Sequence, residues 1–282
     1  MERFLQELRA LGNFEGKTVT IELRSPAESP DQLTPAIEEL VRLPADIIVV
    51  LGSTAAQIAK AATRTIPVVF WGVADAVRLD LVTSLARPEA NVTGVTNFSA
   101  KAVGKGLEYL LQILPGITRV AFVGNLKGNP GVLLQLEAAQ ATAGTIGVQI
   151  VESAVSNAAD IDSAFASFPG SGVKAVMAAS DGIMNINRKQ LVDTAARYRL
   201  PTIYPRREFA DAGGLIGYGP SYPALQERLA VMVDKILHGK APADLPVEQP
   251  KLFDLVPNLR TAEALGMTFP PAILALATDV IR

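Results

Sequence analysis

The chain has 282 residues, enough for two domains of ordinary size, and its 49% apolar and 19% charged residues are typical of a folded globular protein rather than a disordered one. Its net charge of −2 excludes a broad basic surface of the kind that holds nucleic acid or an anionic membrane. The absence of cysteine excludes disulfides, thiol nucleophiles and cysteine-bound metals. The first quarter of the chain already shows alternating helices and strands.

The N-terminal elements begin with a helix that has one apolar face, made by Phe4, Leu5, Leu8 and Leu11, and that ends at Gly12. Residues 18–23 alternate as a strand does, and a second helix is expected near residues 32–42. Four later runs are almost entirely apolar, unlike strands with one solvated face. They predict parallel sheets with helices on both faces, and they cover residues 46–51, 66–71, 119–124 and 173–178.

One pattern occurs twice in the chain. An apolar strand, a turn containing serine, a helix, an arginine two or three residues before a proline and a short strand ending in an aromatic residue follow one another at residues 46–72 and again at 174–207. The alignment matches Ser53 with Ser180, Pro67 with Pro201 and Phe70 with Tyr204. Two similar α/β halves imply a cleft between them.

The remaining elements indicate how the two halves are connected. A helical stripe covers residues 103–114, another helix is expected from about 223 to 237, and three prolines between 242 and 250 favour an extended linker. Short tracts near residues 94–98, 213–220 and 242–250 predict three connections that act as a hinge. We therefore expect an N-terminal lobe of residues 1–97 and 219–245 and a C-terminal lobe of 98–218 and 246–282.

Most catalytic chemistry lacks its components in this sequence. The only histidine, His238, lies at the end of a predicted helix, where it complements the terminal carbonyls. With one histidine and no cysteine, zinc sites and Ser-His or Cys-His nucleophile systems cannot be assembled. We expect no catalytic residue, no metal and no cofactor. An enzyme that uses Asp75 or Asp181 as a base is the weakest of three hypotheses.

Candidate ligand-binding residues follow the predicted strands, because open parallel sheets bind ligands at the carboxyl ends of their strands. In the first half, Ser53 and Thr54 open a helix and suit a carboxylate, although either side chain is also an ordinary helix cap. Trp71 either offers a flat surface to an aromatic or aliphatic ligand or belongs to the core. The other candidates in this half are Asp75, Thr96 and Asn97.

In the second half, Ser180 and Asp181 occupy the place of Ser53 and Thr54. Asp181 either caps its helix or receives an ammonium group from the cleft. Tyr204 and Tyr218 end two strands and would pack against an apolar ligand. The remaining candidates are a turn residue, Asn125, and two charged residues, Arg207 and Glu208, for which surface ion pairs are the alternative.

Several long segments resemble a known family. They are residues 8–24, 40–70, 81–99, 199–220 and a tail from 233 to 271, including LVRLPADIIVVLGSTAAQIAKAATRTIPVVF and LPTIYPRREFADAGGLIGYGP. In these segments the chain is similar to the bacterial ABC-transporter substrate-binding proteins of the TrpX-like type. The resemblance extends over almost the whole chain. It implies the fold of class I periplasmic binding proteins, in which two doubly wound parallel-sheet domains are joined by a three-strand hinge.

The resemblance also implies a function. Such a protein clamps a small organic ligand, an amino acid or an aromatic or carboxylate compound, between its lobes and delivers it to the ABC permease subunits in the membrane. It implies a monomer in the periplasm or another extracytoplasmic space of a bacterium, with no nucleic-acid partner. Family members begin with an export signal and a first strand that this sequence does not show, so we expect a start upstream of Met1. The alternative is the effector-sensing domain of a transcriptional regulator.

Overall fold

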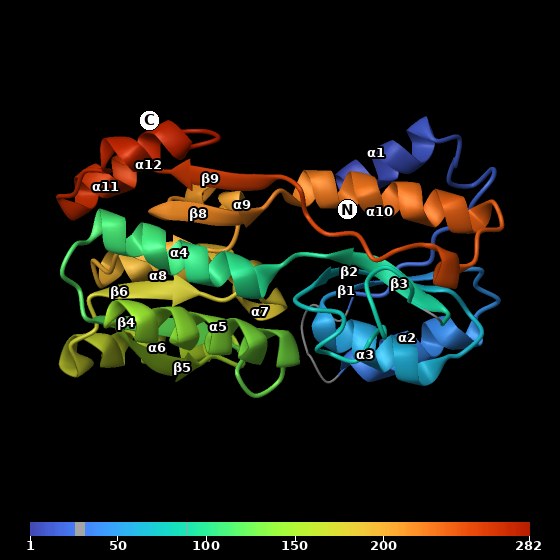
Figure 1. Ribbon diagram of the computed structural model, residues 1–282, viewed down its shortest axis with the longest axis horizontal. Coiled ribbons are helices and arrows are strands. Elements are labelled where there is room, and N and C mark those ends of the chain that lie inside the picture. The colour runs from blue at the N-terminus through green and yellow to red at the C-terminus, as the bar shows by residue number, and fades with distance from the viewer. Residues whose placement is uncertain (26–31, 89) are drawn as a thin grey trace. The chain divides into compact units, whose positions relative to one another are not determined.

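The computed structural model describes residues 1–25, 32–88 and 90–282 (Figure 1). The chain divides into two compact units. Unit 1 comprises Met1–Phe98 and Tyr222–Lys251, and unit 2 comprises Ser99–Ser221 and Leu252–Arg282. The chain therefore passes from one unit to the other at three points along the sequence.

All three points differ from the boundaries expected from the sequence, the first by one residue, because Phe98 belongs to unit 1. Of the two larger differences, the first is that residues 219–221 belong to unit 2, and the second is that residues 246–251 belong to unit 1. The second difference has a clear cause in backbone pairing. Glu248 forms a parallel bridge with Val95, and its amide donates to the carbonyl of Gly94 at 2.9 Å. The proline-rich stretch starts with a single turn of 3-10 helix at Pro242–Asp244 rather than an extended chain.

The sheet of unit 1 has three parallel strands in the order β1-β2-β3, namely Ile48–Leu51, Val68–Val73 and Val92–Thr96. Helices α1 (Glu2–Ala10) and α10 (Tyr222–Leu237) cover one face, and α2 (Leu33–Arg42) and α3 (Ser53–Ala62) lie on the other (Figure 1). The apolar face predicted for the first helix is confirmed, since Phe4 and Leu8 are buried against β2 and α10.

The strand predicted at residues 18–23 does not form. Thr18 lies in a turn closed by a bridge between Glu15 and Val19, and no strand pairs with residues 20–25 in the described part of the chain. Leu23 is 66% exposed, so the alternating pattern has no apolar surface to cover. Alternation gives a strand only where a neighbouring strand supplies partners for its backbone groups.

The sheet of unit 2 has six strands in the order β5-β4-β6-β7-β8-β9. The first five run parallel to one another, and β9 runs antiparallel to β8. In chain order the strands are β4 (Arg119–Gly124), β5 (Gln149–Ala154), β6 (Ala175–Ala178), β7 (Thr202–Tyr204), β8 (Ile216–Pro220) and β9 (Phe253–Pro257).

Helices cover both faces of this sheet, as the apolar strands predict. Helices α4 (Ser99–Ile113), α5 (Pro130–Ile146), α11 (Leu259–Leu265) and α12 (Pro271–Leu276) contribute to one core, and α6 (Ala158–Ser171), α8 (Arg188–Arg197) and α9 (Arg207–Asp211) to the other. Along β4, Val120 and Phe122 face the first core while Ala121 and Val123 face the second. The doubly wound parallel fold expected from the sequence is therefore confirmed.

Helix α7 (Gly182–Ile186) is a short helix between β6 and α8 (Figure 1). No helix in the described part of the chain is both long and apolar enough to cross a membrane.

Candidate ligand-binding site

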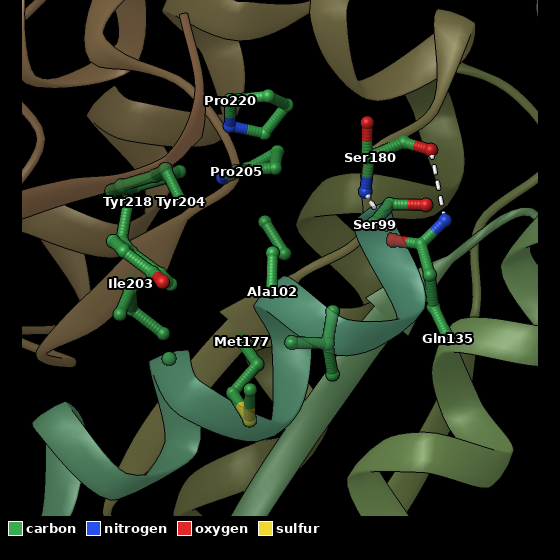
Figure 2. A pocket seen from close by; sticks show the side chains of 13 residues that line it. Ser99, Ala102, Gln135, Met177, Ser180, Ile203, Tyr204, Pro205, Tyr218 and Pro220 are labelled. Atoms are coloured by element: carbon green, nitrogen blue, oxygen red, sulfur yellow. Dashed lines mark hydrogen bonds between the residues drawn. The ribbon is translucent and has the colours of Figure 1, made fainter. Parts of the chain in front are cut away.

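A small hollow opens in unit 2 at the carboxyl ends of β6, β7 and β8, beside the first turns of α4 (Figure 2). Its volume is about 20 Å³, which is room for about one water molecule. Most of its lining is apolar: Ala102, Val103, Gly106, Met177, Ala178, Ile203, Tyr204, Pro205, Tyr218 and Pro220. Among the described residues no Asp, Glu, His, Lys or Arg lines it, so its chemistry suits an apolar group.

The polar side chains of the hollow gather on one side, where Figure 2 shows Ser99, Ser180 and Gln135 together. Gln135 comes from α5 and is 1% exposed. Its amide bonds both backbone groups of Ser180, since the Ser180 amide donates to Oε1 at 2.7 Å and Nε2 donates to the Ser180 carbonyl at 3.1 Å. This side of the hollow is thus fixed by hydrogen bonds between an α5 side chain and the loop after β6.

The opposite side of the hollow is aromatic and aliphatic, with Tyr218 and Ile203 (Figure 2). Tyr204 also contributes to the lining, but its ring packs in the second core of unit 2. Tyr218 meets the ring of Tyr109 edge-on at 5.0 Å and stacks on Phe253 at 6.1 Å. Burial raises the pKa of Tyr218 to about 12, so its hydroxyl stays protonated at neutral pH. Burial also raises the pKa of Tyr204, whose ring stacks on Phe209 at 5.1 Å.

Two glycines of β8 let the backbone after β7 approach this edge closely. A Cβ atom on Gly219 would lie 1.9 Å from the Pro205 carbonyl oxygen, and one on Gly217 would lie 2.6 Å from the Arg206 carbonyl oxygen. Such distances are far below van der Waals contact, so only glycine fits at both positions. The Gly-x-Gly pattern of this strand therefore brings Pro205 and Pro220 to the rim of the hollow.

Of the seven residues predicted in unit 2, the structure brings Ser180, Tyr204 and Tyr218 together around the hollow. The others make local bonds. Asn125 accepts from the Gly128 amide at 2.9 Å, which is an ordinary turn contact. Arg207 pairs with Asp211 at 3.3 Å and with Asp279 at 3.1 Å, in keeping with the surface ion pair that the sequence left open.

Glu208 is tied to its neighbour Arg206 by two hydrogen bonds of 2.5 and 3.2 Å. Burial by itself would raise the pKa of Glu208, but these bonds and the charge of Arg206 outweigh burial and hold the pKa below its usual range. Glu208 is therefore a charged partner of Arg206 and does not line the hollow.

Asp181 serves as the N-cap of α7. Its Oδ1 accepts from the amides of Ile183 at 2.7 Å and Met184 at 3.4 Å, and its Oδ2 accepts from Asn129 Nδ2 at 2.9 Å. Burial raises the pKa of Asp181, although these bonds favour the carboxylate. Of the two roles that the sequence left open, the structure shows the cap, and Asp181 does not line the hollow.

The residues predicted in unit 1 make hydrogen bonds or packing contacts within that unit. Ser53 Oγ accepts from the Ala74 amide at 3.3 Å, and Gly52, not Ser53, is the N-cap of α3. Thr54 follows in the first turn of α3 and is partly exposed. Asp75 Oδ1 accepts from the amides of Val77 and Arg78 at 3.0 Å each, and so closes a turn.

Thr96 and Asn97 are buried links at the end of β3. The Thr96 amide and hydroxyl both donate to the Glu248 carbonyl, at 2.9 and 3.3 Å. Asn97 Nδ2 donates to the Gly72 carbonyl at 3.1 Å. These contacts join β3 to β2 and to the stretch that returns from α10.

Trp71 lies in the core of unit 1 and is 4% exposed. Its ring meets the Tyr222 ring edge-on at 6.0 Å beneath α10. The structure thus gives Trp71 the core position, not the ligand wall, because the side chain at this register of β2 points toward α1 and α10.

We expect Trp71→Phe to lower the free energy of unfolding by about 1–2 kcal/mol, because the smaller ring leaves space in a packed core. The Kd for a ligand should stay within about twofold of wild type, a change of less than about 0.5 kcal/mol in the free energy of binding, because Trp71 lies in the core and not in the hollow. Urea unfolding measures the first quantity and calorimetric titration the second. A large loss of affinity at unchanged stability would show instead that Trp71 contacts the ligand.

Several lining residues have no signal in the sequence. Ser99 and Ala102 come from the start of α4, which reads as an ordinary amphipathic helix. Gln135 lies in the second turn of α5 and contacts a loop 45 residues away. The tract before α4 is predicted as a connection between lobes. The position of α4 directly after that connection is the only feature of the sequence that places its first turn near a binding site.

The comparisons with known proteins agree with this fold. The family model described as ABC transporter substrate binding protein matches residues 2–281. A structure from Vibrio cholerae, described as a conserved domain protein, is 29% identical with a TM-score of 0.93, covering 99% of this chain and 93% of that one. An ABC domain from Streptococcus pneumoniae in complex with L-Trp is 24% identical with a TM-score of 0.87, covering 99% and 96%.

A curated relative, the tyrosine-binding protein of Clostridioides difficile strain R20291, is 22% identical over 264 residues, which are 94% of this chain and 75% of the relative. The two units have the doubly wound parallel architecture of class I periplasmic binding proteins. The chain belongs to the family of ABC transporter substrate-binding proteins.

Proposed function

We propose that this protein is the solute-binding component of an ABC importer, and that its solute is a small organic ligand, an amino acid or an aromatic or carboxylate compound. The observation that carries this proposal is the hollow of unit 2, whose apolar walls have one polar side at Ser180 and Gln135. Such a lining recognises an apolar body and orients its polar end. The ligands named for the two relatives, L-Trp and tyrosine, have this chemistry.

The size of the hollow requires that binding changes the structure. About 20 Å³ holds a water molecule but not an amino acid, so the solute must displace side chains or enter a more open state. We propose that the solute is clamped by both units and stabilises the closed state through contacts that the open state lacks. Ser53, Thr54, Asp75, Thr96 and Asn97 remain the predicted contributions of unit 1.

The family match also supports the partners of this proposal. The loaded protein, a monomer, would act outside the cytoplasm and deliver its solute to a membrane permease, without catalysis, a cofactor or nucleic acid. The effector-sensing domain of a transcriptional regulator stays the alternative prediction, and no feature of the described residues favours it.

Thermal-shift screening followed by calorimetric titration tests the proposal. L-tryptophan, L-tyrosine and benzoate are the probes, with D-glucose as a control of different chemistry. At a ligand concentration 100 times the Kd we expect about 2.7 kcal/mol of added stability, because only the folded state binds. Saturable binding of D-glucose, with no effect of the three carboxylates, would contradict the proposed solute class.

A further inference from the structure

Gln135 lies at the polar side of the hollow, is 1% exposed, and uses its amide to bond backbone groups. Its Oε1 accepts from the Ser180 amide at 2.7 Å, while its Nε2 donates to the carbonyls of Ser180 and Gly131 at 3.1 Å each. The network fixes which end of the amide is oxygen, because an N–H group faces one end and carbonyls face the other. Three hydrogen bonds therefore determine the orientation of one side chain.

The bonded segment lies just beyond the end of the sheet. The Ala179 amide still donates to the Val123 carbonyl at 2.9 Å, and Ser180 is the next residue. Gln135 thus pairs with Ser180 as a neighbouring strand would, using one donor and one acceptor. Without it, both backbone groups of Ser180 would lose these partners in a partly buried place, which is costly.

A second bond from the same helix supports this arrangement. Asn129, the N-cap of α5, accepts from the Gly131 amide at 2.9 Å and donates to Asp181 at 2.9 Å. The start of α5 therefore holds two successive residues of the loop after β6 through two separate side chains. Only Ser180 of these two lines the hollow.

We propose that Gln135 is a positioning residue for solute binding, acting through Ser180, whose side chain it holds against the solute. The inference rests on the proposed function, because it assigns Ser180 to the solute contact. It concerns affinity rather than stability alone: the bonds of Gln135 fix the loop that carries Ser180 at the polar side of the hollow (Figure 2).

The test compares two glutamine-to-methionine changes on the same helix. Gln135→Met keeps the length of the side chain and removes its three hydrogen bonds. Gln140→Met is the matched control, because the Gln140 amide is exposed and bonds Glu152 on β5 at 2.8 Å. With L-tryptophan and L-tyrosine as probes, we expect Gln135→Met to weaken binding by about tenfold, a typical cost of unsatisfied buried groups. Gln140→Met should bind as wild type does.

A double-mutant cycle separates positioning from a general structural effect. In a Ser180→Ala background, Gln135→Met should weaken binding by no more than about twofold, because the group that it positions is absent. Equal binding by Gln135→Met and Gln140→Met would overturn the inference. So would a full tenfold loss that persists in the Ser180→Ala background, since Gln135 would then act through something else.

Two further measurements make the result independent of folding failure and of the choice of solute. If Gln135→Met does not fold, Gln135→Glu replaces it: we expect its affinity relative to wild type to rise as pH falls, because protonation restores a donor toward the two carbonyls. Amide hydrogen exchange at Ser180 needs no ligand and should be faster in the Gln135 variant than in Gln140→Met. Unchanged exchange would refute the positioning role, whereas wild-type protein that binds neither probe would refute only the proposed solute.

Discussion

Replacing Gly219 by alanine is expected to lower the free energy of unfolding by about 3 kcal/mol, at the upper end of the range for overpacked sites. The added Cβ would lie 1.9 Å from the carbonyl oxygen and 2.9 Å from the carbonyl carbon of Pro205. Both are backbone atoms, so no rotamer change relieves the overlap, and β8 must separate from the segment after β7. Urea unfolding monitored by circular dichroism measures the loss.

Gly144→Ala is the matched control in the same unit. Gly144 lies within α5 with no atom within 4 Å of the position of a Cβ, so alanine should stabilise the helix by about 1 kcal/mol. The two substitutions add the same methyl group with opposite expected signs. If Gly219→Ala were as stable as wild type, the close approach of β8 to Pro205 would be wrong.

Tyr218→Ala is expected to weaken the binding of L-tryptophan or L-tyrosine by about 2 kcal/mol, about thirtyfold in Kd, the cost of losing an aromatic anchor. Its ring forms one wall of the hollow and is held between Tyr109 and Phe253. Removal of the ring deletes the contact with an apolar solute and frees both neighbours to move. Calorimetric titration measures the change.

Tyr198→Ala serves as the control for this experiment. Tyr198 is a partly buried tyrosine of the same unit, but it packs near Phe165 in the core on the opposite side of the sheet. We expect this variant to lose stability and to keep its affinity. Similar losses of affinity in both variants would show that the Tyr218 effect reports general damage to unit 2 rather than contact with the solute.

The fold could be predicted where burial on both faces left a clear pattern. The uninterrupted apolar runs of β4 and β6 predicted helices on both sides, and alternate residues of β4 indeed face different cores. Residues 18–23 show the opposite case, because their alternation is that of a strand but no described strand pairs with them. Sequence periodicity indicates that a segment is compatible with a strand, whereas the presence of a neighbouring strand to hydrogen-bond with decides whether the strand forms.

The site was predictable only in part. Strand ends with polar or aromatic residues pointed to Ser180, Tyr204 and Tyr218, which line the hollow. The repeated pattern aligned Ser53 with Ser180, yet Ser53 is the first residue of α3 and Ser180 precedes the cap of α7. The two serines therefore have different surroundings, and the alignment of the two sequence segments did not reveal that difference.

Residues with two ordinary roles could not be assigned from the sequence. Asp181 has the same neighbours along the chain whether it caps a helix or binds an ammonium group, and only the bonds to Ile183 and Asn129 show the cap. Trp71 ends an apolar run in either role, and the register of β2 decides which face it takes. Gln135 gave no signal, since its partner lies 45 residues away.

A crystal structure of the protein grown with L-tryptophan tests the central claim most directly. The account predicts electron density for the solute in unit 2, with its ring against Tyr218 and its polar end toward Ser180. Density for the solute elsewhere, with the hollow still closed around its own side chains, would contradict it.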